Sequence, residues 1–167
     1  KGSTLTLMGN HADALTVYKQ LADSEPGFVD IRFNVYFTQR ALGKEKESVE
    51  TLNKLLKEFP DHVPSILAKG SIEMDAGKFD KAITLFKKAD KLEQDNLNAL
   101  FNIGFCYLEL EDHPTAATWF KKVIDLDNED AGAHYNLAEC LQNMGLDKEA
   151  KEHLDIAQRL EQVSGPQ

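Results

Sequence analysis

The chain of 167 residues is about one domain long, and its 42% hydrophobic and 28% charged residues are the balance of a folded, soluble protein. Its 28 Asp and Glu outnumber 19 Lys and Arg, and the formal net charge of -9 repels phosphate backbones and anionic lipid surfaces. Binding to nucleic acid or a membrane surface is therefore not expected. Membrane insertion is not expected either, because the longest uncharged apolar run, 103–108, is far shorter than the roughly 20 residues of a spanning helix.

A repeat with a period of about 34 residues organises the chain. Glycines recur at one phase of this repeat, at Gly9, Gly43, Gly77 and Gly145. The first two steps between them equal one repeat and the last equals two, and Glu111 occupies the missing position. A small side chain follows each position after five residues, a bulky one after four more, and usually an aliphatic one after another three. Offsets of four and three place these side chains on one face of a helix.

Each repeat is predicted to contain two helices that meet at the glycine position, because glycine ends a helix in the left-handed conformation without a Cβ clash. In chain order, the predicted helices span 11–24, 29–42, 45–58, 63–76, 79–92, 97–110, 113–126, 131–144 and 147–160. No strand is predicted. A partial unit, 1–28, then precedes the complete units 29–62, 63–96, 97–130 and 131–164, in a single domain of residues 1–167.

The last two units carry the clearest pattern. The segments NALFNIGFCYLELEDHPTAATWFKKVIDLDNED and AGAHYNLAECLQNMGLDKEAKEHLDIAQRLEQ resemble the tetratricopeptide repeat (TPR), with its large-x2-Leu-small-x2-Tyr opening and its Ala-x3-Phe-x2-Ala closing. The resemblance extends over essentially the whole chain. It implies an all-α fold, a right-handed superhelical solenoid of antiparallel helix pairs in which each unit buries its apolar face against its neighbours.

Two kinds of position within the first helix of a unit bear on packing. A small residue stands seven places before the glycine position, at Gly70, Gly104 and Ala138, where a larger side chain would hold the paired helices apart. Other positions depart from the TPR pattern. Polar residues replace large apolar ones at Arg32, Gln39, Lys69 and Glu73, and Tyr36 occupies a position that is usually small.

The predicted helix 97–110 is apolar almost all round. Phe101, Phe105 and Leu108 form a stripe apart from the one with Leu100 and Ile103. In TPR proteins the face equivalent to the first stripe lines a concave groove, although these aromatic residues could instead belong to the core. The groove residues implied by the resemblance are Phe33, Asn34, Phe37, Arg40, Leu67, Ser71, Phe101, Asn102, Phe105, Leu108, Tyr135 and Asn136.

The implied groove favours a hydrophobic partner peptide. It offers Arg40 as its one strong cation and adds the acids Asp30, Asp75, Glu109 and Glu139, so capture of an acidic tail by a basic clamp is not expected. Its asparagines, one or two repeats apart, could hold the backbone of an extended peptide or simply solvate the helices. The resemblance therefore implies a non-catalytic protein-interaction module, an adaptor or scaffold, that binds a peptide with an affinity on the order of micromolar.

Two alternatives remain. The chain starts with Lys rather than Met inside the first helix of its partial unit, as in a processed, tagged or cut chain, and helix 11–24 would then expose Leu15, Tyr18 and Leu21. Another copy could cover this N-terminal edge, which would make the protein a homo-oligomeric scaffold. The final unit is also similar to the last repeat of type III secretion translocator chaperones, which act on secreted proteins.

The sequence offers no chemistry of its own. Cys106 and Cys140 are one repeat apart, on helices expected to pack about 8–10 Å apart, so they are predicted to be buried free thiols rather than a disulfide. Such thiols suit a reducing compartment such as the cytoplasm without requiring one. The five histidines fall at unrelated points of the repeat, so no metal is expected. No phosphate-binding loop or nucleophile motif is present, so neither a cofactor nor catalysis is expected.

Overall fold

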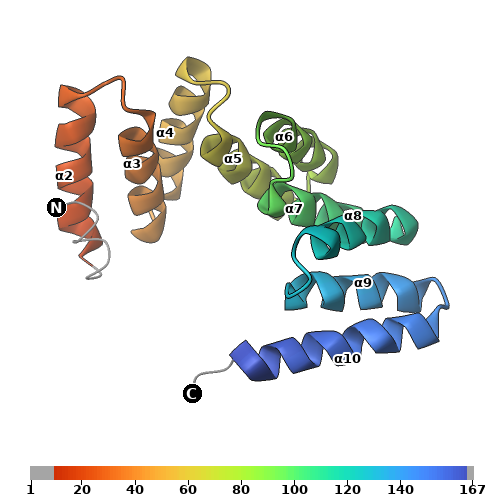
Figure 1. Cartoon of the computed structure of the whole chain (residues 1–167). Coiled ribbons are helices and arrows are strands. Elements are labelled where there is room, and N and C mark those ends of the chain that lie inside the picture. Colours follow the sequence, from red (N-terminus) through yellow and green to blue (C-terminus); the bar gives the residue numbers. More distant parts are fainter. Residues whose placement is uncertain (1–9, 165–167) are drawn as a thin grey trace. The chain divides into compact units, whose positions relative to one another are not determined.

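A computed structural model describes residues 10–164 of the chain. All regular structure within those residues is helical (Figure 1). The helices are α2 (His11–Ser24), α3 (Val29–Ala41), α4 (Glu45–Glu58), α5 (Val63–Asp75), α6 (Phe79–Leu92), α7 (Leu97–Glu109), α8 (His113–Leu126), α9 (Ala131–Asn143) and α10 (Asp147–Ser164). The predicted helices are confirmed, and only α10 differs from its predicted bounds by more than one residue, because it continues to Ser164.

The chain divides into two compact units, residues 1–66 and 67–167, and the boundary between them falls inside α5. In the first unit α3 packs against both α2 and α4. In the second unit each of α6 to α9 packs against the helix that follows it. The division of the chain into four complete repeats and one partial repeat stays a prediction.

The helix ends explain the glycine spacing. Gly43, Gly77 and Gly145 have φ of 70°, 69° and 75°, in the left-handed region that glycine adopts without a Cβ clash. Glu111 occupies the equivalent position with φ of 59°. The N–H of the next residue, Asp112, donates to the Tyr107 carbonyl at 2.9 Å, as the N–H of Lys44 does to the Gln39 carbonyl after Gly43. The turn therefore forms at Glu111 as well, although an L residue is strained there.

Two of the three predicted small-residue positions, Gly70 and Gly104, are confirmed by close contacts with phenylalanine rings. A Cβ atom added at Gly70 would lie 2.5 Å from the nearest atom of the Phe86 ring. At Gly104 the same construction gives 3.0 Å to the Phe120 ring. Both rings are fully buried, so little space exists into which they could retreat. The absence of a side chain at these two glycines lets the second helix of each pair pack directly on the first.

The core of the second unit is continuous from α7 to α10. Leu100 and Leu108 of α7 and Phe120 of α8 belong to one buried cluster with Leu137 and Leu141 of α9. Ala150 extends this cluster to α10. Because α9 buries its apolar face on the pair that precedes it, packing between repeats contributes to this core together with packing within them.

Polar residues at usually apolar positions of the first unit have partners. The Arg32 guanidinium forms an ion pair with Glu58 and lies 5.7 Å from the centroid of the Phe59 ring. The buried Gln39 side chain accepts a hydrogen bond of 2.8 Å from the Thr51 hydroxyl. These contacts satisfy groups that would be costly to bury alone.

The remaining departures are also accommodated. Lys69 and Lys78 lie 3.2 and 3.6 Å from the Glu73 carboxylate. The hydrogen bond from Lys69 is the main reason why the pKa of Glu73 lies below its usual value. Tyr36 is buried, and its hydroxyl accepts a hydrogen bond from Arg40. The helices therefore pack as in the repeat pattern, although polar contacts replace apolar ones at these positions.

The predicted exposed N-terminal edge is largely wrong. Leu15 and Tyr18 are only 6% and 7% exposed, and they share a buried cluster with Ala14 of α2 and Val35 of α3. Leu21 alone of the predicted three is exposed. Packing against α3 was underestimated because α2 was treated as a helix without its partner. The proposed edge for self-association therefore loses most of its apolar surface.

The single tryptophan reports on the second unit. The Trp119 ring of α8 lies 5.8 Å from the ammonium groups of both Lys87 and Lys122. Lys87 also donates a hydrogen bond of 3.1 Å to the Tyr107 hydroxyl. The indole therefore contacts residues of α6 and α8 and packs against the core cluster, so its fluorescence is a suitable signal for unfolding of this unit.

Replacing Glu111 with glycine is expected to stabilise the second unit. The change relieves the cost of a left-handed L residue, so the free energy of unfolding should rise by about 0.5–1 kcal/mol. Urea unfolding followed by Trp119 fluorescence measures this difference. The matched control, Gly145→Ala, should lower the free energy of unfolding by a similar amount. A lower value for Glu111→Gly would contradict this explanation of the turn.

Candidate functional site

In the first unit, the predicted groove residues of α3 differ in exposure. Phe37 is 55% exposed, whereas Phe33 is half-buried with its ring 5.4 Å from Tyr36 and 5.5 Å from His62. Arg40 is exposed, and Asn34 is half-buried. Phe37 is thus the residue of this face that offers an open aromatic ring to a partner.

In the second unit, much of the predicted apolar stripe packs inside the stack. Phe101 and Phe105 are half-buried against the core, and the Phe101 ring lies 5.5 Å from the Phe120 ring. A Cβ atom at Gly132 of α9 would lie 3.4 Å from the Phe101 ring. Leu108 is only 8% exposed and belongs to the core, which corrects its prediction as an open groove residue. The physical reason is that α9 covers this stripe.

The remaining predicted residues keep accessible surface. Tyr135 is 55% exposed, and Asn102 and Asn136 are half-buried at equivalent points of α7 and α9. The Asn102 amide donates a hydrogen bond of 2.7 Å to the Asn98 carbonyl of its own helix. Leu67 and Ser71 are half-buried, and the Ser71 hydroxyl donates to the Leu67 carbonyl. Asn102 thus hydrogen-bonds to its own helix through one donor, and both proposed roles of the asparagines stay predictions.

Two hollows lie beside this face in the second unit. The α9–α10 hollow has a volume of about 740 Å³ and is lined by Tyr135, Ala138, Glu139, Gln142, Asn143, Asp147, Ala150, Lys151 and Leu154. The acidic hollow, of about 430 Å³, is lined by Leu108, Glu109, Glu111, His113, Glu139 and Asn143. The two share Glu139 and Asn143. Sequence reasoning missed the α10 residues because it sought a groove on first helices only.

Burial and nearby acidic residues raise the pKa of the two cysteines of these helices. Cys106 and Cys140 are buried and free, which confirms the predicted thiols. Burial, followed by the charges of Glu109 and Glu139 respectively, raises the pKa of each to about 11. Because the thiolate is the reactive form, both side chains are inert apolar groups near neutral pH.

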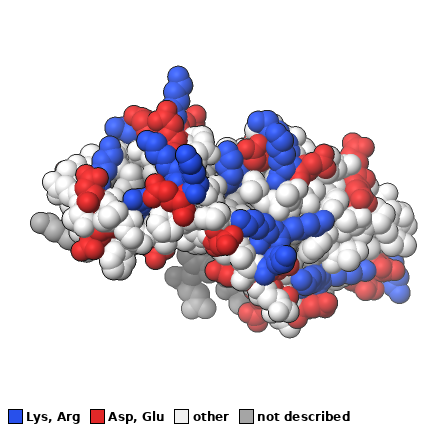
Figure 2. All heavy atoms as spheres, turned by 90° about the horizontal axis from the view of Figure 1, so that it is seen from above, with Lys and Arg blue, Asp and Glu red and all other residues white. Residues whose placement is uncertain are grey.

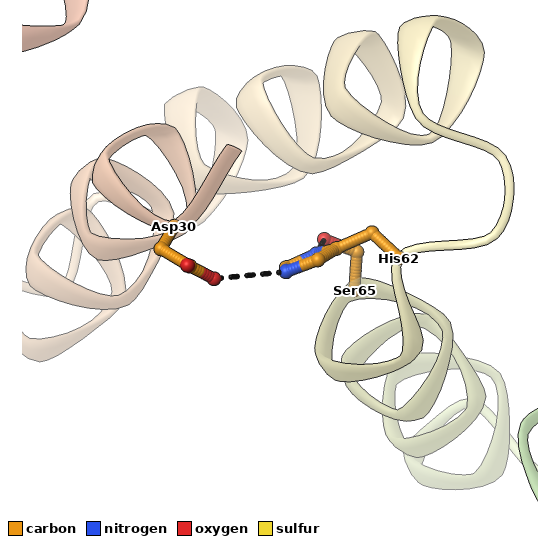
Figure 3. A network of polar contacts seen from close by, with 3 residues as sticks. All are labelled: Asp30, His62 and Ser65. Carbon is orange, nitrogen blue, oxygen red and sulfur yellow. Dashed lines mark hydrogen bonds and ion pairs between the residues drawn. The ribbon is translucent and has the colours of Figure 1, made fainter. Parts of the chain in front are cut away.

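One polar network of the first unit combines the residue types of a hydrolase triad (Figure 3). His62 Nε2 lies 3.2 Å from Asp30 Oδ1, and His62 Nδ1 lies 2.7 Å from Ser65 Oγ. However, Ser65 is fully buried in the first turn of α5, so its hydroxyl is closed to a substrate. The network instead ties the start of α5 to α3, and it supplies no accessible nucleophile.

A pair of histidines joins α9 to α10. His134 is buried, its Nδ1 lies 2.9 Å from Nδ1 of His153, and its Nε2 lies 3.2 Å from the Asn128 carbonyl. Because a carbonyl oxygen can only accept, Nε2–H of His134 donates to it, and in the neutral ring Nδ1 then accepts a hydrogen bond from Nδ1–H of His153. Sequence spacing did not reveal this pair because the two residues lie on different helices.

Charge and composition limit other chemistries. Acidic and basic side chains are interspersed on the face that Figure 2 shows. Across residues 10–164, no three His, Cys, Asp or Glu side chains are grouped so that they could hold a metal ion. None of the described helices is long and apolar enough to cross a membrane. The accessible features are therefore aromatic and amide groups together with charged groups of both signs on helix faces.

Helix pairs that recur once per repeat and stack through small-residue contacts define a helical-repeat interaction protein, and sequence comparison agrees. The family model of the tetratricopeptide repeat matches residues 37–62. The model of subunit 3 of the anaphase-promoting complex, or cyclosome, matches residues 75–157. The chain is a tetratricopeptide repeat protein.

Solved structures share this fold. MamA from residue 41 to its end, from Desulfovibrio magneticus RS-1, has a TM-score of 0.83 and 21% identity over 99% of this chain and 93% of that one. Another crystal structure of MamA has a TM-score of 0.81 and 20% identity, over 97% of this chain and 95% of that one. At these identities the likeness concerns the fold alone.

Two relatives found by sequence match this chain over only part of their own length. Protein CTR9 homolog of Arabidopsis thaliana is 28% identical over 113 residues, which are 67% of this chain and 10% of that protein. BBSome complex member BBS4 of Mus musculus is 27% identical over 106 residues, which are 64% and 20% of the two chains. The chain thus matches about a tenth and a fifth of the length of these relatives.

Because His153 faces His134, the protein is expected to lose stability in acid. Burial, the facing His134 and Lys121 lower the pKa of His153 below its ordinary 6.5, while Glu152 and Glu149 oppose this shift. As the pH falls below 6.5, His153 of the unfolded chain takes up a proton before His153 of the folded chain does. The stability that the neutral His153 contributes is therefore fully present above pH 6.5, and it is lost progressively as the pH falls towards the lower pKa of the folded state. Urea unfolding followed by Trp119 fluorescence at pH 7.5 and 5.5 should show a smaller decrease for His153→Gln than for the parent. Equal decreases would contradict the assignment.

Proposed function

We propose that this tetratricopeptide repeat protein binds a partner peptide, predominantly hydrophobic, on the exposed faces of its first helices. The observation that carries the proposal is the 55% exposure of two aromatic rings at the predicted positions, Phe37 in one unit and Tyr135 in the other. Large rings with open faces bury much area at a small loss of rotamer entropy, so they are effective contacts for a partner.

The polar groups of this face suit a peptide backbone. Asn102 and Asn136 are one repeat apart on α7 and α9 of the same unit. Asn102 already donates to its own helix, so its side-chain carbonyl is the group that could accept from a backbone N–H. The two asparagines would then orient the peptide, while Tyr135 and the accessible edges of Phe101 and Phe105 would supply apolar contact.

The surrounding charge favours a peptide with basic flanks. Glu109 and Glu139 are exposed on the same two helices, and carboxylates beside a groove repel an acidic peptide. The partner is therefore an apolar segment with Lys or Arg at its ends, bound extended or as a short amphipathic helix. This binding requires no reaction, in keeping with the closed position of Ser65 and the inert thiols.

The test is photo-cross-linking followed by affinity measurement. A benzophenone amino acid at position 136 should form an adduct with a partner in an extract of the source cells, and mass spectrometry identifies the cross-linked segment. The purified segment should then bind Asn102→Ala/Asn136→Ala about tenfold more weakly than the parent. The control Thr84→Ala/Thr118→Ala alters two exposed residues one repeat apart on the second helices and should bind like the parent. Unchanged affinity of the asparagine variant would overturn the proposal.

A further inference from the structure

The α9–α10 hollow occupies the place where one more helix would stack. The residues one repeat before its lining are Phe101, Gly104, Phe105, Leu108, Glu109, His113, Ala116, Ala117 and Phe120. Of these, Leu108, Ala117 and Phe120 belong to the cluster that α9 completes with Leu137 and Leu141. The hollow therefore presents, one repeat later, the surface that α7 and α8 present to α9.

The shape of the surface is kept while its rim becomes polar. Apolar side chains remain along the floor of the hollow, at Tyr135, Ala138, Ala150 and Leu154. Around them, Glu139 replaces Phe105, Gln142 replaces Leu108, and Lys151 replaces Ala117. A surface with this rim is tolerated in water when uncovered, whereas a fully apolar one would aggregate. The hollow is thus suited to a helix that binds reversibly.

The charge of the rim indicates the chemistry of that helix. Glu139 and Asp147 line the α9–α10 hollow, and Lys151 is the one basic residue among the described residues that line it. The adjoining acidic hollow, which shares Glu139, adds Glu109 and Glu111. Four carboxylates line these two hollows, which share Glu139. They favour a cationic occupant, because an acidic helix would bring further negative charge next to them as water is excluded.

We infer that the α9–α10 hollow is a docking site for a basic amphipathic helix of a partner protein, which adjoins the proposed peptide-binding face and shares Tyr135 and Glu139 with it. The helix lies beside α9 as α9 lies beside α7. Its small residues pack against Tyr135, as Gly132 packs against Phe101, and its apolar stripe covers Ala138 and Ala150. Its Lys or Arg side chains pair with Glu139 and Asp147.

The test uses a designed helix as the probe. A fluorescein-labelled peptide, roughly four helical turns long, carries an Ala and Leu stripe flanked by lysines, and its twin carries Glu in place of each Lys. Fluorescence anisotropy should show at least tenfold tighter binding of the basic peptide to the whole chain, with weaker binding at high salt. Glu139→Lys should reduce the affinity about tenfold. The control Glu161→Lys makes the same charge change on an exposed residue of α10 outside the hollow, and it should reduce the affinity by less than twofold.

Further measurements locate the peptide. A benzophenone in its apolar stripe should cross-link within residues 147–154 of α10. Binding should be unchanged in Asn102→Ala/Asn136→Ala, whose effect concerns the peptide-binding face alone. The inference is overturned if the parent does not bind the basic peptide, if both lysine variants lose affinity equally, or if the asparagine variant abolishes binding. It is also overturned if light scattering shows a dimer that Glu139→Lys dissociates, because the occupant would then be a second copy.

Discussion

The close approach of a glycine to a phenylalanine ring is the constraint on which the second unit depends. At Gly70 and Gly104 the ring of the following helix lies where a Cβ atom would clash, so the ring packs directly on the backbone of the first helix of the pair. This spacing directs the remaining apolar residues of each helix towards the neighbouring pair. Leu137 and Leu141 of α9 can then join the core of α7 and α8. Packing between pairs is therefore a consequence of packing within them.

The same geometry explains why equivalent repeat positions of α7 and α9 have different roles. Phe101 and Phe105 of α7 are largely covered because α9 lies on them, whereas Tyr135 and Glu139 at the equivalent points of α9 remain exposed. The change from Phe105 to Glu139 keeps the second surface compatible with water. The position of a residue within the stack, and not only its phase in the repeat, decides whether it stabilises the fold or is available to a partner.

The regular features of the fold were predictable from the sequence, since the spacing of Gly43, Gly77 and Gly145 reports directly on backbone conformation at helix ends. Contacts between helices were less predictable. Sequence phase placed Leu108 on a groove, but its burial depends on α9, and the His134–His153 pair joins two helices through side-chain directions that spacing does not encode. The hollow beside Tyr135 was missed for the same reason, although comparing each α9 and α10 residue with the one a repeat earlier would have identified it.

The most direct measurement is the free energy of unfolding of Gly70→Ala, Phe86→Leu and the double variant, from urea unfolding followed by Trp119 fluorescence. If the contact sets the helix spacing, Gly70→Ala should destabilise the protein by about 1–3 kcal/mol, because the added methyl group overpacks a buried ring. The double variant should lose less stability than the sum of the two single changes, because the smaller leucine gives room to the methyl group. If Gly70→Ala instead stabilised the protein by about 1 kcal/mol, as alanine does at an ordinary position inside a helix, the account would be contradicted.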